Sequence, residues 1–196
     1  MTRSTDPTPL LLPEWDVSNW LNTPTPIALK SLRGRVVLLH AFQMLCPSCV
    51  AYGLPQAQRV RLGFPHDDLA VIGLHTVFEH HDAMTVQALQ AFVHEYRWSF
   101  PIGVDQPDGC VGPSRTMTRY GLRGTPSCIV LDREGRVQLH HFGQIDDLAL
   151  GALLGGLIAG RQQTNFHHAE VHASSPDSLI SGACSSAGCA VQEPAQ

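Results

Sequence analysis

Residues 36–49 read VVLLHAFQMLCPSC, and this stretch decides how the rest of the chain is interpreted. Its first half, Val36–Phe42, is a nearly unbroken apolar run with β-branched residues at its start, which predicts a strand buried on both faces. Two cysteines, Cys46 and Cys49, follow this strand. Residues 49–62, which begin with Cys49, can form a helix. A Cys-x-x-Cys pair between a strand and a helix favours redox chemistry.

The spacing of the two cysteines brings both thiols close together within one helical turn. Cys46 then lies at the helix N-terminus, where free N–H groups and the helix dipole favour a thiolate. The dipole supplies about 0.3–1 kcal/mol, whereas one pKa unit corresponds to about 1.4 kcal/mol. Direct N–H···S hydrogen bonds must therefore supply the rest of any activation. Pro47 suits the first helical turn, because its missing N–H is not needed there.

A lone Cys-x-x-Cys has two other interpretations, half of a zinc site or two unrelated buried cysteines. Zinc would need two further ligands, and the candidates are Cys184 and Cys189 or one of the 11 histidines. The position between a strand and a helix favours a redox pair over both.

The remaining elements alternate between strands and helices. We expect a strand at 69–77, helices at 84–96, 114–120 and 146–159, and two strands, Ser127–Leu131 and 137–141, around the turn at 132–136. The helix at 49–62 contains Pro55, which should kink it. This order combines crossover units with a terminal hairpin, so the sequence predicts an α/β fold with a mixed central sheet flanked by helices.

Length and composition indicate one folded domain with extensions, since the chain has 196 residues, 43% of them hydrophobic and 15% charged. We expect an extended N-terminal arm at 1–26 anchored by Trp15 and Trp20, a domain at 27–160, and a flexible tail containing Cys and His at 161–196. A net charge of -4 gives no reason to expect nucleic acid as a partner.

The sequence also suggests a location. No stretch approaches the roughly 20 apolar residues of a membrane span, and the first residues lack the pattern of a secretory signal. We therefore expect a cytoplasmic protein, in which paired cysteines are catalytic or metal-binding before they are structural. Processing of the N-terminus would instead place the protein in the periplasm.

The motifs together resemble the thioredoxin superfamily. The resemblance rests on the strand before Cys46 and Cys49, on the helix containing Pro55, and on Gly124-Thr125-Pro126-Ser127 before a strand. Residues 73–79 and the helix after them resemble the insertion of TlpA/ResA-type thiol–disulfide oxidoreductases of the redoxin family. The resemblance covers about residues 25–160 and implies a thioredoxin-like fold with an inserted helical segment.

The resemblance also implies roles for individual residues. Cys46 would be the attacking nucleophile and Cys49 the resolving thiol. Thr125-Pro126 would form a cis peptide beside the disulfide and, with Pro47 and Ser48, would contact the substrate. The redox-active disulfide needs no cofactor and no metal. The implied partners are a disulfide-containing protein or small-thiol substrate and a thiol electron donor.

Two positions depart from thioredoxins. Leu45 stands where thioredoxins carry Trp, and His40 replaces the buried acid six residues before the first cysteine. His40 is either a satisfied core residue or a group that exchanges protons with Cys49. Glu79 matches an active-site carboxylate of ResA-like proteins and is either a proton acceptor that tunes the thiols or a solvated loop acid. Burial near the thiols would raise its pKa.

Four other cysteines have weaker assignments. Cys110 is expected on a loop, unpaired in the sequence and without a function. We expect Cys128 to be a small core residue. The tail pair Cys184 and Cys189 has three open interpretations: an accessory redox pair that relays electrons to Cys46 and Cys49, a transient metal site, or no function.

The best-supported function is thiol–disulfide exchange, in the reductive direction if the protein is cytoplasmic. One alternative is a peroxiredoxin-like thiol peroxidase with antioxidant activity, although Gln43 and Leu39 stand where that family has Thr or Ser and Pro. The other alternative is a thiol-based Cu/Zn carrier, since thiolates suit both metals.

Overall fold

The computed structural model describes residues 10–109 and 112–160, together with the backbone of residues 189–190. A six-stranded sheet forms its centre, in the order β1-β4-β3-β2-β6-β7. The strands are β1 (Val17–Leu21), β2 (Val36–Phe42), β3 (Leu69–His75), β4 (Ile102–Asp105), β6 (Ser127–Leu131) and β7 (Val137–Phe142). β2, β3 and β4 are mutually parallel, and β1, β6 and β7 pair antiparallel with their neighbours. The sheet is therefore mixed, as the sequence predicts.

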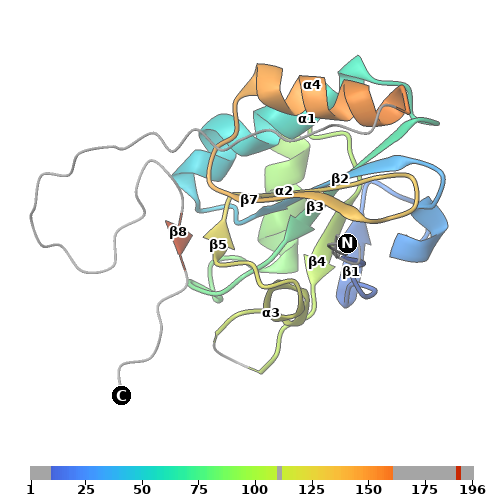
Figure 1. The fold of residues 1–196 in the computed structure, drawn as a ribbon. Coiled ribbons are helices and arrows are strands. Elements are labelled where there is room, and N and C mark those ends of the chain that lie inside the picture. Colours follow the sequence, from blue (N-terminus) through green and yellow to red (C-terminus); the bar gives the residue numbers. More distant parts are fainter. Residues whose placement is uncertain (1–9, 110–111, 161–188, 191–196) are drawn as a thin grey trace, which may run out of the picture.

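The helices cover this sheet on both faces. They are α1 (Leu54–Gly63), α2 (Val86–Tyr96), α3 (Arg115–Arg119) and α4 (Asp147–Ile158), with a short 3₁₀ helix, η1 (Leu29–Leu32). α1 and α4 lie side by side, and α3 lies on the other side of the sheet from them (Figure 1). Gln56 of α1 donates a hydrogen bond to Asp147 of α4 over 2.7 Å. The predicted helices at 84–96, 114–120 and 146–159 are confirmed, with ends that shift by one or two residues, whereas the α-helical part of the helix expected at 49–62 begins at Leu54.

Strands β2 and β3 form the centre of the core. Every residue of both strands is buried, which agrees with their apolar sequences, because parallel strands covered on both faces lose the alternation of polar and apolar side chains. The turn expected at 132–136 is also present: Asp132 N–H donates to the Arg136 carbonyl, and Gly135 takes a φ of 79°.

Part of the predicted N-terminal arm belongs to the sheet. β1 pairs with β4 at the edge of the sheet, and the sequence analysis does not anticipate this strand. Trp15 is an anchor as expected: its side chain is 8% exposed, and its indole N–H donates to the Ile27 carbonyl over 2.8 Å. The Trp20 ring lies 5.8 Å from the Trp15 ring.

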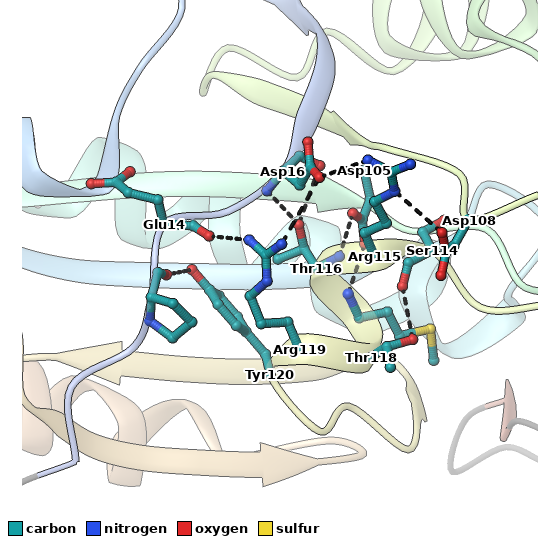
Figure 2. Close-up of polar contacts among 12 residues, drawn as sticks. Glu14, Asp16, Asp105, Asp108, Ser114, Arg115, Thr116, Thr118, Arg119 and Tyr120 are labelled. Carbon is teal, nitrogen blue, oxygen red and sulfur yellow. Dashed lines mark hydrogen bonds and ion pairs between the residues drawn. The ribbon is translucent and has the colours of Figure 1, made fainter.

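Polar contacts join this N-terminal segment to α3 (Figure 2). Tyr120 donates its hydroxyl to the Pro13 carbonyl over 2.6 Å, and Asp16 N–H donates to the Thr116 hydroxyl over 2.8 Å. Arg115 forms an ion pair with Asp16 at 3.2 Å. The contacts hold α3 against the start of the domain, and the chain runs from α3 directly into the loop at 124–126.

Asp105, the last residue of β4, is a buried capping group for α3. Its carboxylate accepts hydrogen bonds from the backbone N–H groups of Thr116 and Met117, over 2.8 and 2.9 Å, and from the Thr76 hydroxyl over 3.0 Å. Burial raises the pKa of Asp105, while these hydrogen bonds oppose the rise. The carboxylate thus fixes the distance between β4 and α3.

A second, two-stranded sheet lies beside the main one. β5 (Gly124–Thr125) pairs antiparallel with β8 (Cys189–Ala190), and Figure 1 shows the two short strands next to each other. The sequence analysis anticipates neither strand.

Candidate active site

The two cysteines lie where the chain leaves β2 and begins a helix. The Cys46 carbonyl accepts a hydrogen bond from Val50 N–H over 3.1 Å, so Cys46 takes the capping position and Pro47 is the first helical residue. A π-helical turn, η2 (Cys49–Gly53), precedes α1, and Pro55 is among the first residues of α1. The backbone hydrogen bonding therefore changes from the π-helical to the α-helical pattern next to Pro55, which has no N–H to donate.

The two thiols are close together and differ in their surroundings. Their sulfur atoms lie 2.6 Å apart, and both residues are 0% exposed. The backbone N–H of Cys49 donates to Cys46 Sγ over 3.3 Å, which is a direct N–H···S bond of the kind expected. Burial raises the pKa of Cys49 well above its ordinary value, and the hydrogen bond and charge of Cys46 raise it further. Cys49 thus holds its proton, and Cys46 receives the hydrogen bond that favours a thiolate.

The loop that contains Thr125 and Pro126 completes the site. The bond between the two residues is cis, as the resemblance implies. The Cys46 thiol donates to the Thr125 carbonyl over 3.5 Å, although the two residues are 79 positions apart in the sequence. The Pro126 carbonyl accepts from Gly143 N–H over 2.8 Å, and the Ser127 hydroxyl donates to the Gly124 carbonyl over 2.8 Å. Both sides of the loop are therefore held in place.

His40 lies on β2 behind the π-helical turn. It is 4% exposed, and its Nε2 has no hydrogen-bond partner among the residues that the structure describes. The ring lies so close to Gly53 that a Cβ at that position would overlap with Nε2. Burial lowers the pKa of His40 to about 4, so the imidazole is neutral at pH 7.

A cavity of about 160 Å³ lies beside His40 and the cis proline. His40, Pro126 and Cys128 are among the residues that line it, as are Tyr52 and Gln144. A space of this size and polarity can hold water, which could exchange protons with the unpaired Nε2.

Glu79 is connected to the site through Gln43. The Gln43 side chain donates to Glu79 over 3.4 Å and accepts from Phe78 N–H over 3.2 Å, while its backbone carbonyl accepts from Cys46 N–H over 3.3 Å. The sequence analysis missed Gln43 as a site residue. Its position in the sequence could have indicated it, because Gln43 is a polar residue between the buried strand and the cysteine motif.

The other predicted residues take several positions around the thiols. Ser48 is buried beside them, whereas Pro47 and Leu45 are exposed, Leu45 at 54%. Cys128 is a core residue as expected, 2% exposed and with its pKa raised to about 12 by burial. Cys184 lies outside the described residues, and of Cys189 the structure describes the backbone.

Within residues 10–109 and 112–160, there is no group of three or more His, Cys, Asp or Glu side chains that could hold a metal ion. In the same part of the chain, every helix is too short or too polar to span a membrane.

The fold of this chain agrees with the folds of known proteins. The chain is 52% identical to a thioredoxin-like superfamily protein of known crystal structure, with a TM-score of 0.73, and the match covers 76% of this chain and 96% of that one. A thiol-disulfide isomerase from Corynebacterium glutamicum is 47% identical, with a TM-score of 0.72 and the same coverage. The chain belongs to the thioredoxin-like superfamily.

Curated relatives of known sequence include the protein DipZ of Mycobacterium bovis and of Mycobacterium tuberculosis. Each is 30% identical over 132 residues, which is 66% of this chain. The matched region spans 18% of the length of DipZ. No family model matches the chain.

Proposed function

We propose that this protein is a thiol–disulfide oxidoreductase that reduces protein disulfides through Cys46 and Cys49. The observation that carries the proposal is the pair of thiols 2.6 Å apart at a helix N-terminus, with the cis Thr125–Pro126 bond beside them. The similarity to the thiol-disulfide isomerase from C. glutamicum supports the same class of reaction.

The difference between the surroundings of the two thiols supports the following order of steps. Cys46 Sγ, as a thiolate, attacks one sulfur of the substrate disulfide, and the other substrate sulfur leaves as a thiolate and takes up a proton. Cys49 then loses its proton and attacks Cys46 Sγ. This second attack releases the remaining substrate thiol and leaves a Cys46–Cys49 disulfide, so the substrate gains the two electrons that the dithiol loses.

The second step needs a group that receives the Cys49 proton. His40 lines the cavity, and its Nε2 has no hydrogen-bond partner within the described part of the chain, while Glu79 is joined to the Cys46 backbone through Gln43. A base with a pKa of about 4 binds a proton poorly at pH 7, so His40 would pass the proton on to cavity water without keeping it. Replacing His40 by Leu should slow the release of the substrate thiol more than the first attack. Replacing Glu79 by Gln should alter the same step if the carboxylate is the acceptor.

The backbone of the cis-proline loop is placed to hold an extended substrate. Thr125 lies in the short strand β5, and the edge of β5 pairs with the strand β8. A peptide that adds to such an edge gains main-chain hydrogen bonds without requiring a particular sequence. The exposed Leu45 and Pro47 beside the buried thiols offer apolar contact to its side chains.

Three assays on the same protein test the function. We expect the chain to accelerate insulin reduction by dithiothreitol, and Cys46→Ser to abolish the acceleration while Cys128→Ala retains it. Peroxide consumption without insulin reduction would instead indicate a thiol peroxidase. Stoichiometric Cu(I) or Zn(II) binding without turnover would indicate a metal carrier. Full insulin reduction by Cys46→Ser would contradict the proposal.

A further inference from the structure

A strand from the C-terminal part of the chain occupies the edge of the cis-proline loop. In the pairing of β8 with β5, Cys189 lies opposite Thr125 and Ala190 lies opposite Gly124 (Figure 1). The same Thr125 accepts the hydrogen bond from the Cys46 thiol. The chain thus places its own strand, and within it a cysteine, on the edge that a substrate peptide would use.

The register brings the backbone of Cys189 close to the reactive pair. Residues directly opposite each other in antiparallel strands have Cα atoms about 4.5–5.5 Å apart. The Thr125 carbonyl lies 3.5 Å from Cys46 Sγ. A disulfide joins Cα atoms about 4.4–6.8 Å apart, and Thr125 is the residue that both contacts the Cys46 thiol and pairs with Cys189.

The burial of the thiols is the second observation. Both Cys46 and Cys49 are 0% exposed, whereas cysteines that react with external partners are partly exposed. An external disulfide that binds at Thr125 must therefore take the place of β8. A partner attached to the same chain needs no such exchange and benefits from an effective concentration that reaches the millimolar range for tethered groups.

We propose that Cys189 is an internal redox partner of Cys46, with β8 bound as a substrate strand. This inference rests on the proposed function. The Cys189 thiolate attacks Cys46 Sγ of the oxidised site, forming a Cys46–Cys189 disulfide and releasing Cys49 as a thiol. A thiolate of an external dithiol then attacks Cys189 Sγ and releases Cys46, and the second thiol of that dithiol closes its own disulfide and releases Cys189.

These steps balance with the external dithiol as the reductant. One disulfide and three thiols are present before the exchange and after it, so the Cys46/Cys49 pair gains the two electrons that the dithiol loses. Cys189 is a thiol at the start and at the end. The bound strand also competes with external peptides for the edge at Thr125.

The test traps the intermediate in the full-length chain. In Cys49→Ser, dilute protein oxidised with diamide should form an intrachain disulfide between Cys46 and Cys189, identified by mass spectrometry of a non-reducing digest. Additional replacement of Cys184 by Ser should leave this bond in place, because the bond needs Cys189 alone as the partner of Cys46. The matched variant Cys49→Ser/Cys189→Ser should yield none of it.

Other outcomes overturn the inference. The inference is wrong if Cys46 forms disulfides chiefly with Cys184 or Cys110. It is also wrong if Cys46 forms disulfides only between two chains, or forms none. Insulin reduction by the wild-type chain, measured beside the trap, reports on the proposed function separately. Insulin turnover without the trapped bond overturns the internal partner alone, and the trapped bond without insulin turnover contradicts the external activity alone.

Discussion

Acidification from pH 7 to pH 5 should lower the free energy of unfolding of the reduced protein by about 4 kcal/mol through two buried histidines. His40 and His75 are 4% and 1% exposed. Burial lowers the pKa of His40 to about 4 and that of His75 to about 3, from 6.5 in the unfolded chain. Neither ring nitrogen of His75 has a hydrogen-bond partner in the described part of the chain.

The magnitude follows from proton linkage. At pH 5 the unfolded chain binds nearly one proton at each histidine, whereas the folded chain binds almost none. The final pH of 5 lies about 1.5 units below the pKa of a histidine in the unfolded chain. At about 1.4 kcal/mol per unit, this difference gives about 2 kcal/mol for each histidine. The stabilisation is present above pH 6.5 and is lost as the pH falls toward the folded pKa values.

Urea unfolding at pH 7, 6 and 5, with a phosphine reductant present, measures this loss. Replacing His75 by Leu should reduce the loss between pH 7 and pH 5 by about 2 kcal/mol. The comparison is between two pH values of one variant, so the variant's own stability cancels. His94→Gln is the matched control, because the His94 side chain is 66% exposed. Equal pH dependence in the wild type and His75→Leu would refute the reasoning.

Three further substitutions test the packing around the site. Gly53→Ala should destabilise the chain by about 1–3 kcal/mol, because its Cβ overlaps with the His40 ring; a second change, His40→Ala, should recover part of the loss in urea unfolding, and no recovery would contradict the assigned contact. Asp105→Ala leaves three buried donors without an acceptor and should cost about 3 kcal/mol or more, with Asp105→Asn less damaging by the same measurement. The Asp146 side chain caps α4 by accepting hydrogen bonds from two backbone N–H groups. Asp146→Ala removes this cap and should lower the free energy of unfolding by about 1 kcal/mol, measured by thermal unfolding, with insulin reduction retained.

The sequence predicts the centre of the fold well because its signals there are local. The apolar run Val36–Phe42 and the cysteine spacing lie within one short stretch, and both the strand and the helix after it are present. β1, β5 and β8 were not anticipated, since each depends on a partner far along the chain. β1, with the sequence VSNWL, has too few apolar residues to mark it as a strand before its pairing with β4 is known.

The site shows the same division. The cysteine pair and its helix-terminal position follow from the motif, while the approach of Thr125 to Cys46 was expected only from the resemblance. The contact between His40 and Gly53 and the link from Gln43 to Glu79 are tertiary. Periodicity contains no information about which side chains meet across a turn, so sequence reasoning left two roles open for His40.

The most direct test of the central claim is a single-turnover reaction with a peptide disulfide in the Cys49→Ser/Cys189→Ser chain. The proposed mechanism predicts that each reduced chain releases one peptide thiol and forms one mixed disulfide, which mass spectrometry locates at Cys46. The same reaction with Cys46→Ser/Cys189→Ser should release none. Equal release of peptide thiol by both chains would contradict the assignment of Cys46 as the nucleophile.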